Sequence, residues 1–155
     1  MEAGAIYANR QMILPIAEGG RSAETEFVPV AQAGGFTLAR VHPRTGRLHQ
    51  IRVHAAFLGH PVAGDKLYPD PELMMEFVRH GFTPRLADRL PLNRHALHAA
   101  EIVFHTRLGE EPFAAPPAAD MVRFCRERMS VDLAHYHSEY GVPSRLFASE
   151  PLRSS

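Results

Sequence analysis

The stretch that decides the fold covers residues 42–68 and reads HPRTGRLHQIRVHAAFLGHPVAGDKLY. It opens with the turn signal PRTG (43–46), after which apolar residues recur at helical spacing. Because Gly59 stands where a helix commonly ends, the pattern predicts a helix over residues 47–59. The glycine- and proline-containing run over residues 61–68 is expected to be a loop.

Strand-forming segments precede this stretch. Residues 25–30 and 36–42 are rich in β-forming residues, and the Gly34-Gly35 pair between them predicts an antiparallel hairpin. Since Pro29 has no backbone N–H to donate to a neighbouring strand, we expect the first segment to be an edge strand.

Helices and a further strand follow. An aspartate before a proline and a later glycine predict a helix over residues 71–81. The remaining elements are predicted as an irregular connection at 82–94, a strand at 101–105, a helix at 120–129 and a weak helix at 131–140. Strands and helices without regular β-α-β alternation indicate an α+β fold, with a mixed, mainly antiparallel sheet and flanking helices. We expect the three strands to lie in one sheet.

Charge is balanced over the whole chain but not locally. The 155 residues contain 17 Lys+Arg and 17 Asp+Glu, so net charge does not mark a nucleic-acid or membrane binder. Between Glu26 and Asp65, however, the chain has four arginines, four histidines and no acid; the arginines are Arg40, Arg44, Arg47 and Arg52. Such a window either meets an anion or pairs with acids from elsewhere in the fold.

Several other chemistries lack a sequence signal. The four histidines of the window are His42, His49, His54 and His60, and the last three miss the i, i+4 spacing that places two metal ligands on one helical face. No G-x-S-x-G element is present, and the single Cys125 is expected to be a buried apolar residue. The N-terminus lacks signal-peptide features, and no apolar run is long enough to span a membrane. We therefore expect a cytoplasmic protein with no metal site and no membrane partner.

Residues 42–68 closely resemble the third motif of RluA-type RNA pseudouridine synthases. Its pattern is T-G-R-x-H-Q-[IL]-R-V-H followed by L-G-H-P-x-x-G-D-x-x-Y, and every fixed position is met. Four flanking segments also agree with the family: N-R-x-M (9–12), A-x-T-x-F (23–27), L-H-A-A-E-I-V-F (97–104) and A-P-P-A-A-D-M (115–121). The resemblance implies that residues 1–121 are the C-terminal portion of a synthase catalytic domain. Residues 122–155 lie beyond it, and their pattern predicts a helical extension and tail.

The resemblance also implies an activity. Enzymes of this family convert uridine to pseudouridine in ribosomal or transfer RNA without metal or cofactor, using an aspartate that attacks a nucleotide turned out of its stack. Arg52 occupies the position whose arginine pairs with that aspartate. Arg40, Arg44 and Arg47 then become candidates for phosphate contacts, whereas His60, Gly64 and Asp65 are expected to shape a loop.

The nucleophilic element of the family, H-R-L-D-x-x-[TS]-S-G, does not occur in these 155 residues. We expect the chain to correspond to the C-terminal half of a synthase domain, inactive alone. It then either pairs with a missing N-terminal half or self-associates through an uncovered sheet edge. Arg52 is expected to be exposed in an open groove or paired with a substitute acid. The alternative function is a non-catalytic remnant that binds RNA through the arginine window, residues 40–52.

Overall fold

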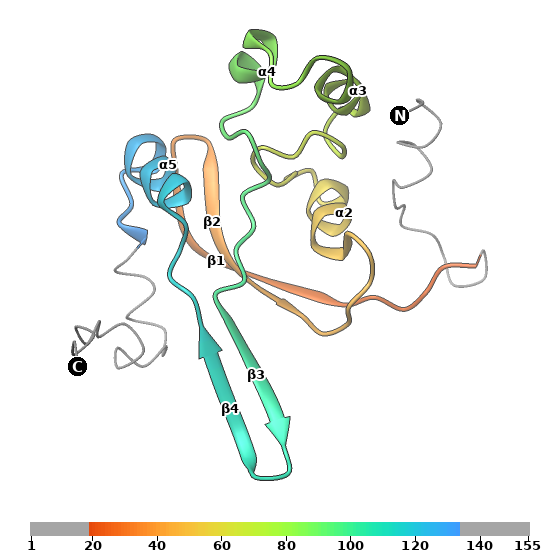
Figure 1. Cartoon of the computed structure of the whole chain (residues 1–155), viewed down its shortest axis with the longest axis vertical. Coiled ribbons are helices and arrows are strands. Elements are labelled where there is room, and N and C mark those ends of the chain that lie inside the picture. The colour runs from red at the N-terminus through yellow and green to blue at the C-terminus, as the bar shows by residue number, and fades with distance from the viewer. Residues whose placement is uncertain (1–18, 134–155) are drawn as a thin grey trace, which may run out of the picture. The chain divides into compact units, whose positions relative to one another are not determined.

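The computed structural model describes residues 19–133. Contacts within the chain divide it into two compact units, Met1–Leu97 and His98–Ser155. The first unit contains the β1–β2 hairpin and helices α2, α3 and α4, and the second contains the β3–β4 hairpin and helix α5 (Figure 1). The predicted α+β class with antiparallel strand pairing is confirmed.

Strands β1 (Thr25–Ala33) and β2 (Phe36–Pro43) form the predicted antiparallel hairpin. The connecting residues Gly34 and Gly35 have φ values of 58° and 79°. Positive φ at both positions is the geometry of a two-residue turn that matches the twist of its strands, and glycine adopts it without steric cost. The pairing register shifts between Pro29 and Ala31, where a bulge accommodates the proline.

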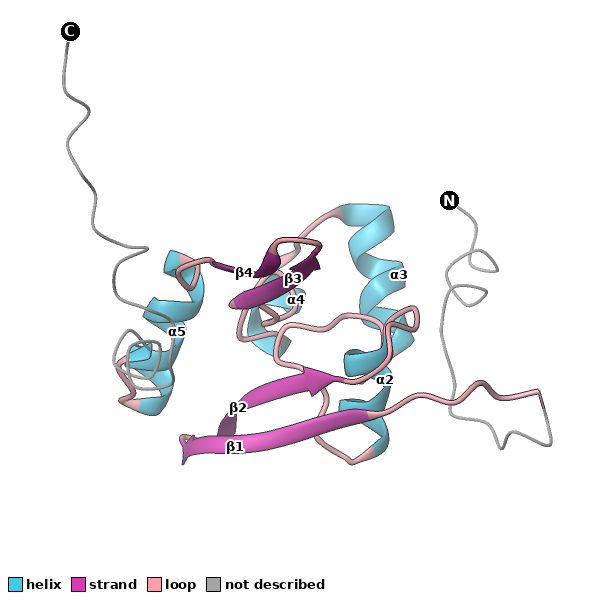
Figure 2. Cartoon of the chain, turned by 90° about the horizontal axis from the view of Figure 1, so that it is seen from below, coloured by secondary structure: helices cyan, strands magenta, loops and turns pink. Residues whose placement is uncertain are grey.

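Helix α2 (Gln50–Phe57) follows β2, and Figure 2 shows β2 running toward it. The helix begins three residues later than the predicted residue 47, because His49 has the left-handed φ of 56°. It ends as predicted: Gly59 has a φ of 81°, and its N–H donates to Ala56 O at 3.0 Å. The next N–H, of His60, donates to Ala55 O at 2.9 Å, which completes a Schellman motif.

Helix α3 (Pro71–His80) confirms the prediction for residues 71–81. The Asp70 carboxylate accepts a hydrogen bond from the Glu72 N–H at 3.1 Å, and Gly81 ends the helix with a φ of 72°. The prediction of an irregular connection at 82–94 is wrong in part, because it contains helix α4 (Pro84–Arg89). This short helix forms because Thr83 caps its first turn and Leu86 is completely buried.

The core of the first unit lies between the loop over residues 61–68 and helices α2, α3 and α4. One cluster joins Leu67, Tyr68 and Met75 to partly buried residues of α2 and α3. A second cluster consists of Leu73, Leu86 and Leu90, and it packs α3 against α4. The loop over residues 61–68 is therefore part of the core on one side, which fixes its conformation.

The second unit contains β3 (Glu101–Thr106), β4 (Gly109–Ala114) and the confirmed helix α5 (Ala119–Met129). The expectation that all strands share one sheet is wrong, because β3 pairs with β4 and not with the first hairpin. The sequence analysis predicts no strand at the position of β4. It pairs with β3 because a two-residue connection costs little loop-closure entropy.

The weak helix expected at 131–140 falls mostly on residues 134–140, which lie outside the described residues. Within residues 19–133, the structure has no helix of the length and apolar character needed to cross a bilayer.

Candidate functional site

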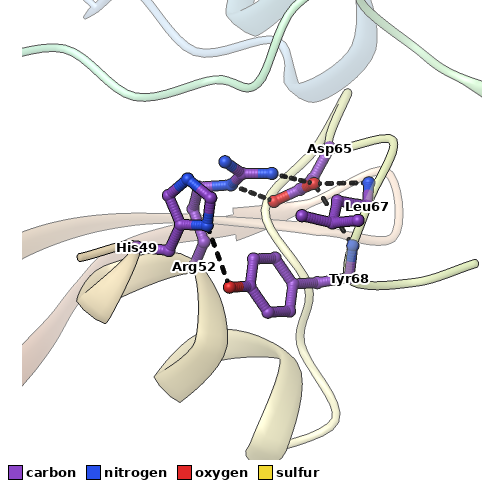
Figure 3. A network of polar contacts seen from close by, with 5 residues as sticks. All are labelled: His49, Arg52, Asp65, Leu67 and Tyr68. Carbon is purple, nitrogen blue, oxygen red and sulfur yellow. Dashed lines mark hydrogen bonds and ion pairs between the residues drawn. The ribbon is translucent and has the colours of Figure 1, made fainter. Parts of the chain in front are cut away.

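Arg52 and Asp65 form the centre of the polar site (Figure 3). Arg52 projects from α2, and its Nε and Nη2 donate to Asp65 Oδ2 and Oδ1 at 2.7 and 2.8 Å. The Asp65 side chain is fully buried, and that of Arg52 is 15% exposed. A two-point ion pair of this kind fixes direction as well as charge. Of the two arrangements expected for Arg52, the structure therefore has the one with a substitute acid.

The loop itself holds Asp65 in place. Asp65 Oδ1 also accepts hydrogen bonds from the backbone N–H groups of Leu67 and Tyr68, at 2.9 and 3.4 Å. Burial by itself raises the pKa of Asp65, but the hydrogen bonds from Arg52 and from these backbone groups outweigh it and hold the pKa below its ordinary value. The carboxylate is therefore ionised at neutral pH.

Tyr68 and His49 support the arginine from the other side. The Arg52 guanidinium carbon lies 5.0 Å from the centre of the Tyr68 ring, within the range of a cation–π contact. The Tyr68 hydroxyl and His49 Nδ1 are 3.1 Å apart and share a hydrogen bond, as Figure 3 shows. Burial, followed by the charge of Arg52, lowers the pKa of His49, so its imidazole is neutral at pH 7.

Close packing fixes the loop next to Asp65. Gly64 has a φ of 74°, and a Cβ at this position would lie 2.0 Å from the carbonyl oxygen of Arg94. The backbone of residues 92–94 therefore packs directly against Gly64. Lys66 binds the same segment, because its ammonium group donates to the carbonyl oxygen of Asn93.

Gln50 ties the basic turn to the first hairpin. Its side-chain oxygen accepts hydrogen bonds from the Thr45 hydroxyl and the Arg47 N–H at 2.7 and 3.0 Å. Its amide nitrogen donates to Glu24 O and to the Thr25 hydroxyl at 2.8 and 2.9 Å. The residue is 4% exposed. One buried amide therefore holds the PRTG turn against the start of β1.

The other predicted RNA-binding arginines line β2 and the following turn. Arg40 is half-buried on β2, while Arg44 and Arg47 are exposed. Arg44 pairs with Glu26 at 2.8 Å, both groups being largely solvated, and Arg47 Nε donates to Ser22 O at 3.2 Å. Two arginines of the window thus pair with the acids that bound it in sequence, Glu26 and Asp65.

The remaining candidates show other roles. The His60 backbone ends α2, whereas its side chain is exposed. Cys125 is buried in α5, and burial raises the pKa of its thiol. Among residues 19–133, no three His, Cys, Asp or Glu side chains come together to hold a metal ion.

Comparisons with known proteins show which proteins this chain resembles. No family model matches the chain. It is 34% identical over 125 residues to "Ribosomal large subunit pseudouridine synthase C" of Escherichia coli O157:H7, a match that covers 80% of the chain and 37% of the relative. The protein of the same name from Vibrio vulnificus (strain CMCP6) is 37% identical over 100 residues, 64% of the chain and 29% of the relative.

The chain is a homologue of the pseudouridine synthases. Within that class, its resemblance to the RluA-type family is confirmed. The matches span about a third of the length of these relatives, 29–37%.

The motif predicts Arg52 as a site residue but does not by itself show which residues hold it. Asp65 was expected only to shape a loop, and no role was predicted for His49, Gln50 or Tyr68. The available signal was their presence at fixed positions of the same motif. Polar residues at fixed positions around a functional arginine are candidates for its supporting contacts.

Proposed function

We propose that this chain is the arginine-bearing part of a catalytic domain that isomerises uridine to pseudouridine in ribosomal RNA. The observation that carries the proposal is the orientation of Arg52: a motif residue of a pseudouridine synthase homologue, held rigidly by Asp65, with Nη1 directed away from the pair (Figure 3). The nucleophilic aspartate comes from a segment that these 155 residues do not contain.

The role of Arg52 follows from its charge and donors. A carboxylate that attacks a nucleoside must stay ionised and point at the reacting carbon. A guanidinium beside it lowers the carboxylate pKa and fixes its plane through N–H groups in a rigid fork. Hydrogen bonding to Asp65 raises the pKa of Arg52 above its ordinary value, so the cation persists at any working pH.

Asp65 does not replace the missing nucleophile. Its side chain is fully buried, and its oxygens accept hydrogen bonds from Arg52 and from two backbone N–H groups. A carboxylate in this state cannot approach a nucleoside without losing these contacts. The chain alone is therefore expected to be inactive.

Tritium release tests this function. Pseudouridine formation replaces the C5–H bond of uridine, so an active enzyme releases tritium from 5-tritiated uridine in ribosomal RNA. We expect no release by the chain alone. Release should appear when the chain is fused to the part of the E. coli O157:H7 relative that lies outside the match. In the fusion, Arg52→Ala should lower kcat by about 10²-fold or more.

Arg79→Ala, which removes an exposed arginine of α3, is the matched control and should leave kcat unchanged. Turnover by the unfused chain would show that the site is complete without another aspartate. Equal activity of the Arg52→Ala and Arg79→Ala fusions would disprove the assigned role.

A non-catalytic RNA-binding fragment is the second candidate, because Arg40, Arg44 and Arg47 lie on β2 and the adjacent turn. Three phosphate contacts to a single strand predict a log–log salt slope of about −2, at roughly 0.7 counterions per phosphate. Binding titrations at several salt concentrations measure this slope, and Arg47→Ala should make it shallower by about 0.7. A slope near zero would contradict binding through these residues.

Partners and location follow from the same proposal. RNA is the expected macromolecular partner, and the cytoplasm, where ribosomal RNA is processed, is the proposed location. A segment that supplies the N-terminal half, or a second copy of the chain, is proposed to cover the open strand edges.

A further inference from the structure

The way Asp65 holds Arg52 divides the guanidinium into two edges. Nε and Nη2 form the edge that faces Asp65, and both donate to its carboxylate. Nη1 and the second hydrogen of Nη2 form the other edge, and Nη1 points away from the pair in Figure 3. Among the described residues 19–133, Nη1 has no hydrogen-bond partner. A guanidinium has five N–H donors, so a second planar anion can bind the free edge while Asp65 stays in place.

The surrounding residues keep the same edge of the Arg52 guanidinium facing Asp65. Asp65 is anchored by the backbone of Leu67 and Tyr68, and Gly64 beside it has no space for a side chain. The Tyr68 ring lies 5.0 Å from the guanidinium carbon, and its hydroxyl is tied to His49. Exchange of Asp65 for another acid would leave two buried backbone donors unpaired, which is costly.

We propose that Asp65 and Tyr68 are positioning residues that hold Arg52 as a charge-neutral fork whose free edge binds a second carboxylate. The Arg52–Asp65 pair has no net charge, so Arg52 supplies direction and hydrogen bonds rather than attraction for RNA. The attraction comes from the arginines of β2 and the PRTG turn. The inference rests on the proposed function only for the origin of the second carboxylate, the nucleophilic aspartate.

Nuclear magnetic resonance of arginine side chains in the full 155-residue chain tests, without any RNA, whether Asp65 holds the Nε edge of Arg52. Arg52 Nε–H should exchange with water at least about tenfold more slowly than Arg44 Nε–H, since Arg44 pairs with Glu26 through Nη2 and is exposed. Equal exchange rates in the unaltered chain would overturn the proposal, whatever the variants do.

The free edge is tested by adding acetate at constant ionic strength. Acetate should shift the Arg52 Nη signals while Nε–H stays protected. Inorganic phosphate is the competing probe. A response to phosphate but not to acetate would assign the edge to an RNA phosphate and overturn the carboxylate assignment, as would loss of Nε–H protection on adding acetate.

Charge neutrality is tested by the salt slope of RNA binding. The double variant Arg52→Met/Asp65→Asn keeps the net charge, so its salt slope should equal that of the unaltered chain. In Arg47→Ala the salt slope should become shallower by about 0.7. If the salt slope of the double variant becomes as shallow as that of Arg47→Ala, Arg52 acts as an ordinary cation and the proposal fails. If Arg47→Ala has no effect, the RNA-binding proposal fails, and the exchange rates still decide the role of Asp65.

Discussion

Glu26 and Asp65 bound the acid-free window of the sequence, and each pairs with an arginine from inside it. The two pairs differ in burial and therefore in how firmly each arginine is held. Arg44 and Glu26 are solvated, so their pair is worth little and a phosphate can replace the glutamate. Arg52 and Asp65 are shielded from water, so their pair is a fixed part of the site.

The backbone at Gly64 gives the first prediction at this scale. Gly64→Ala requires a side chain at a φ of 74° and places Cβ 2.0 Å from the carbonyl oxygen of Arg94. We expect a loss of unfolding free energy of about 3 kcal/mol or more. Gly59→Ala is the matched control, since its φ is 81° and no atom lies within 4 Å of the added Cβ. It should cost about 1 kcal/mol. Equal losses in urea unfolding would contradict this packing.

The second prediction at this scale concerns the pH dependence of the unfolding free energy. The folded-state pKa of Asp65 is below its unfolded value, so the unfolded state binds more protons as the pH falls. The stabilisation by Asp65 is present above about pH 4 and disappears as the pH drops through the folded pKa. Asp65→Asn should cost about 3 kcal/mol at pH 7, and its unfolding free energy should approach that of the unaltered chain in acid. Parallel curves from pH 7 to acid pH would show that Asp65 contributes no such linkage.

At the scale of the element, helix ends in the first unit are determined by a few adjacent residues. The Asp70 carboxylate caps α3, Pro71 occupies its first position, and Gly81 ends it. Helix α2 has a different start: His49 adopts the left-handed conformation and makes no side-chain cap. Its N-terminus is determined by contacts of the loop and not by a capping residue.

The cap of α3 can be tested directly. Asp70→Ala removes the hydrogen bond to the Glu72 N–H and should lower the unfolding free energy by about 1 kcal/mol. Asp70→Asn keeps a capping oxygen but loses the exposed pair with Arg89, so it should cost only a few tenths of a kcal/mol. Thermal and urea unfolding of both variants measure the difference. An asparagine variant as unstable as the alanine variant would assign the stabilisation to charge.

At the scale of the molecule, the β3–β4 hairpin exposes apolar surface. Ile102, Phe104 and Phe113 are each about half exposed, at 53%, 51% and 53%, and the register places them on one face. Among residues 19–133, β3 and β4 pair only with each other. Open strand edges beside an apolar face favour association.

We therefore predict that the chain self-associates through this hairpin. Sedimentation at increasing concentration should show a rising average mass, and Phe104→Ser should reduce it. Leu108→Ser is the matched control: Leu108 is 96% exposed but lies in the connecting turn, so its replacement should change the mass little. A monomer at every concentration, or an equal effect of both variants, would contradict the prediction.

Local signals in the sequence were sufficient for the turn of the first hairpin, for both ends of α3 and for the C-terminal end of α2. The Gly34-Gly35 hairpin, the cap at Asp70-Pro71 and the end of α2 at Gly59 each depend on neighbouring residues. The motif over residues 42–68 was sufficient to show the resemblance to RluA-type pseudouridine synthases, and it predicts Arg52 as a site residue. These features were predictable because turn and cap energies depend on a short segment of chain.

Only the tertiary structure decided which groups meet. The partner of Arg52 lies 13 residues away, and it is Asp65 because the loop presents that carboxylate beside α2 with two backbone donors behind it. Likewise, β3 pairs with β4 and not with the first hairpin, although β4 has the sequence GEEPFA, in which only Phe113 is a strong β-former. Such pairings depend on competition between distant segments for burial and hydrogen bonds, and that competition is resolved by the packed chain as a whole.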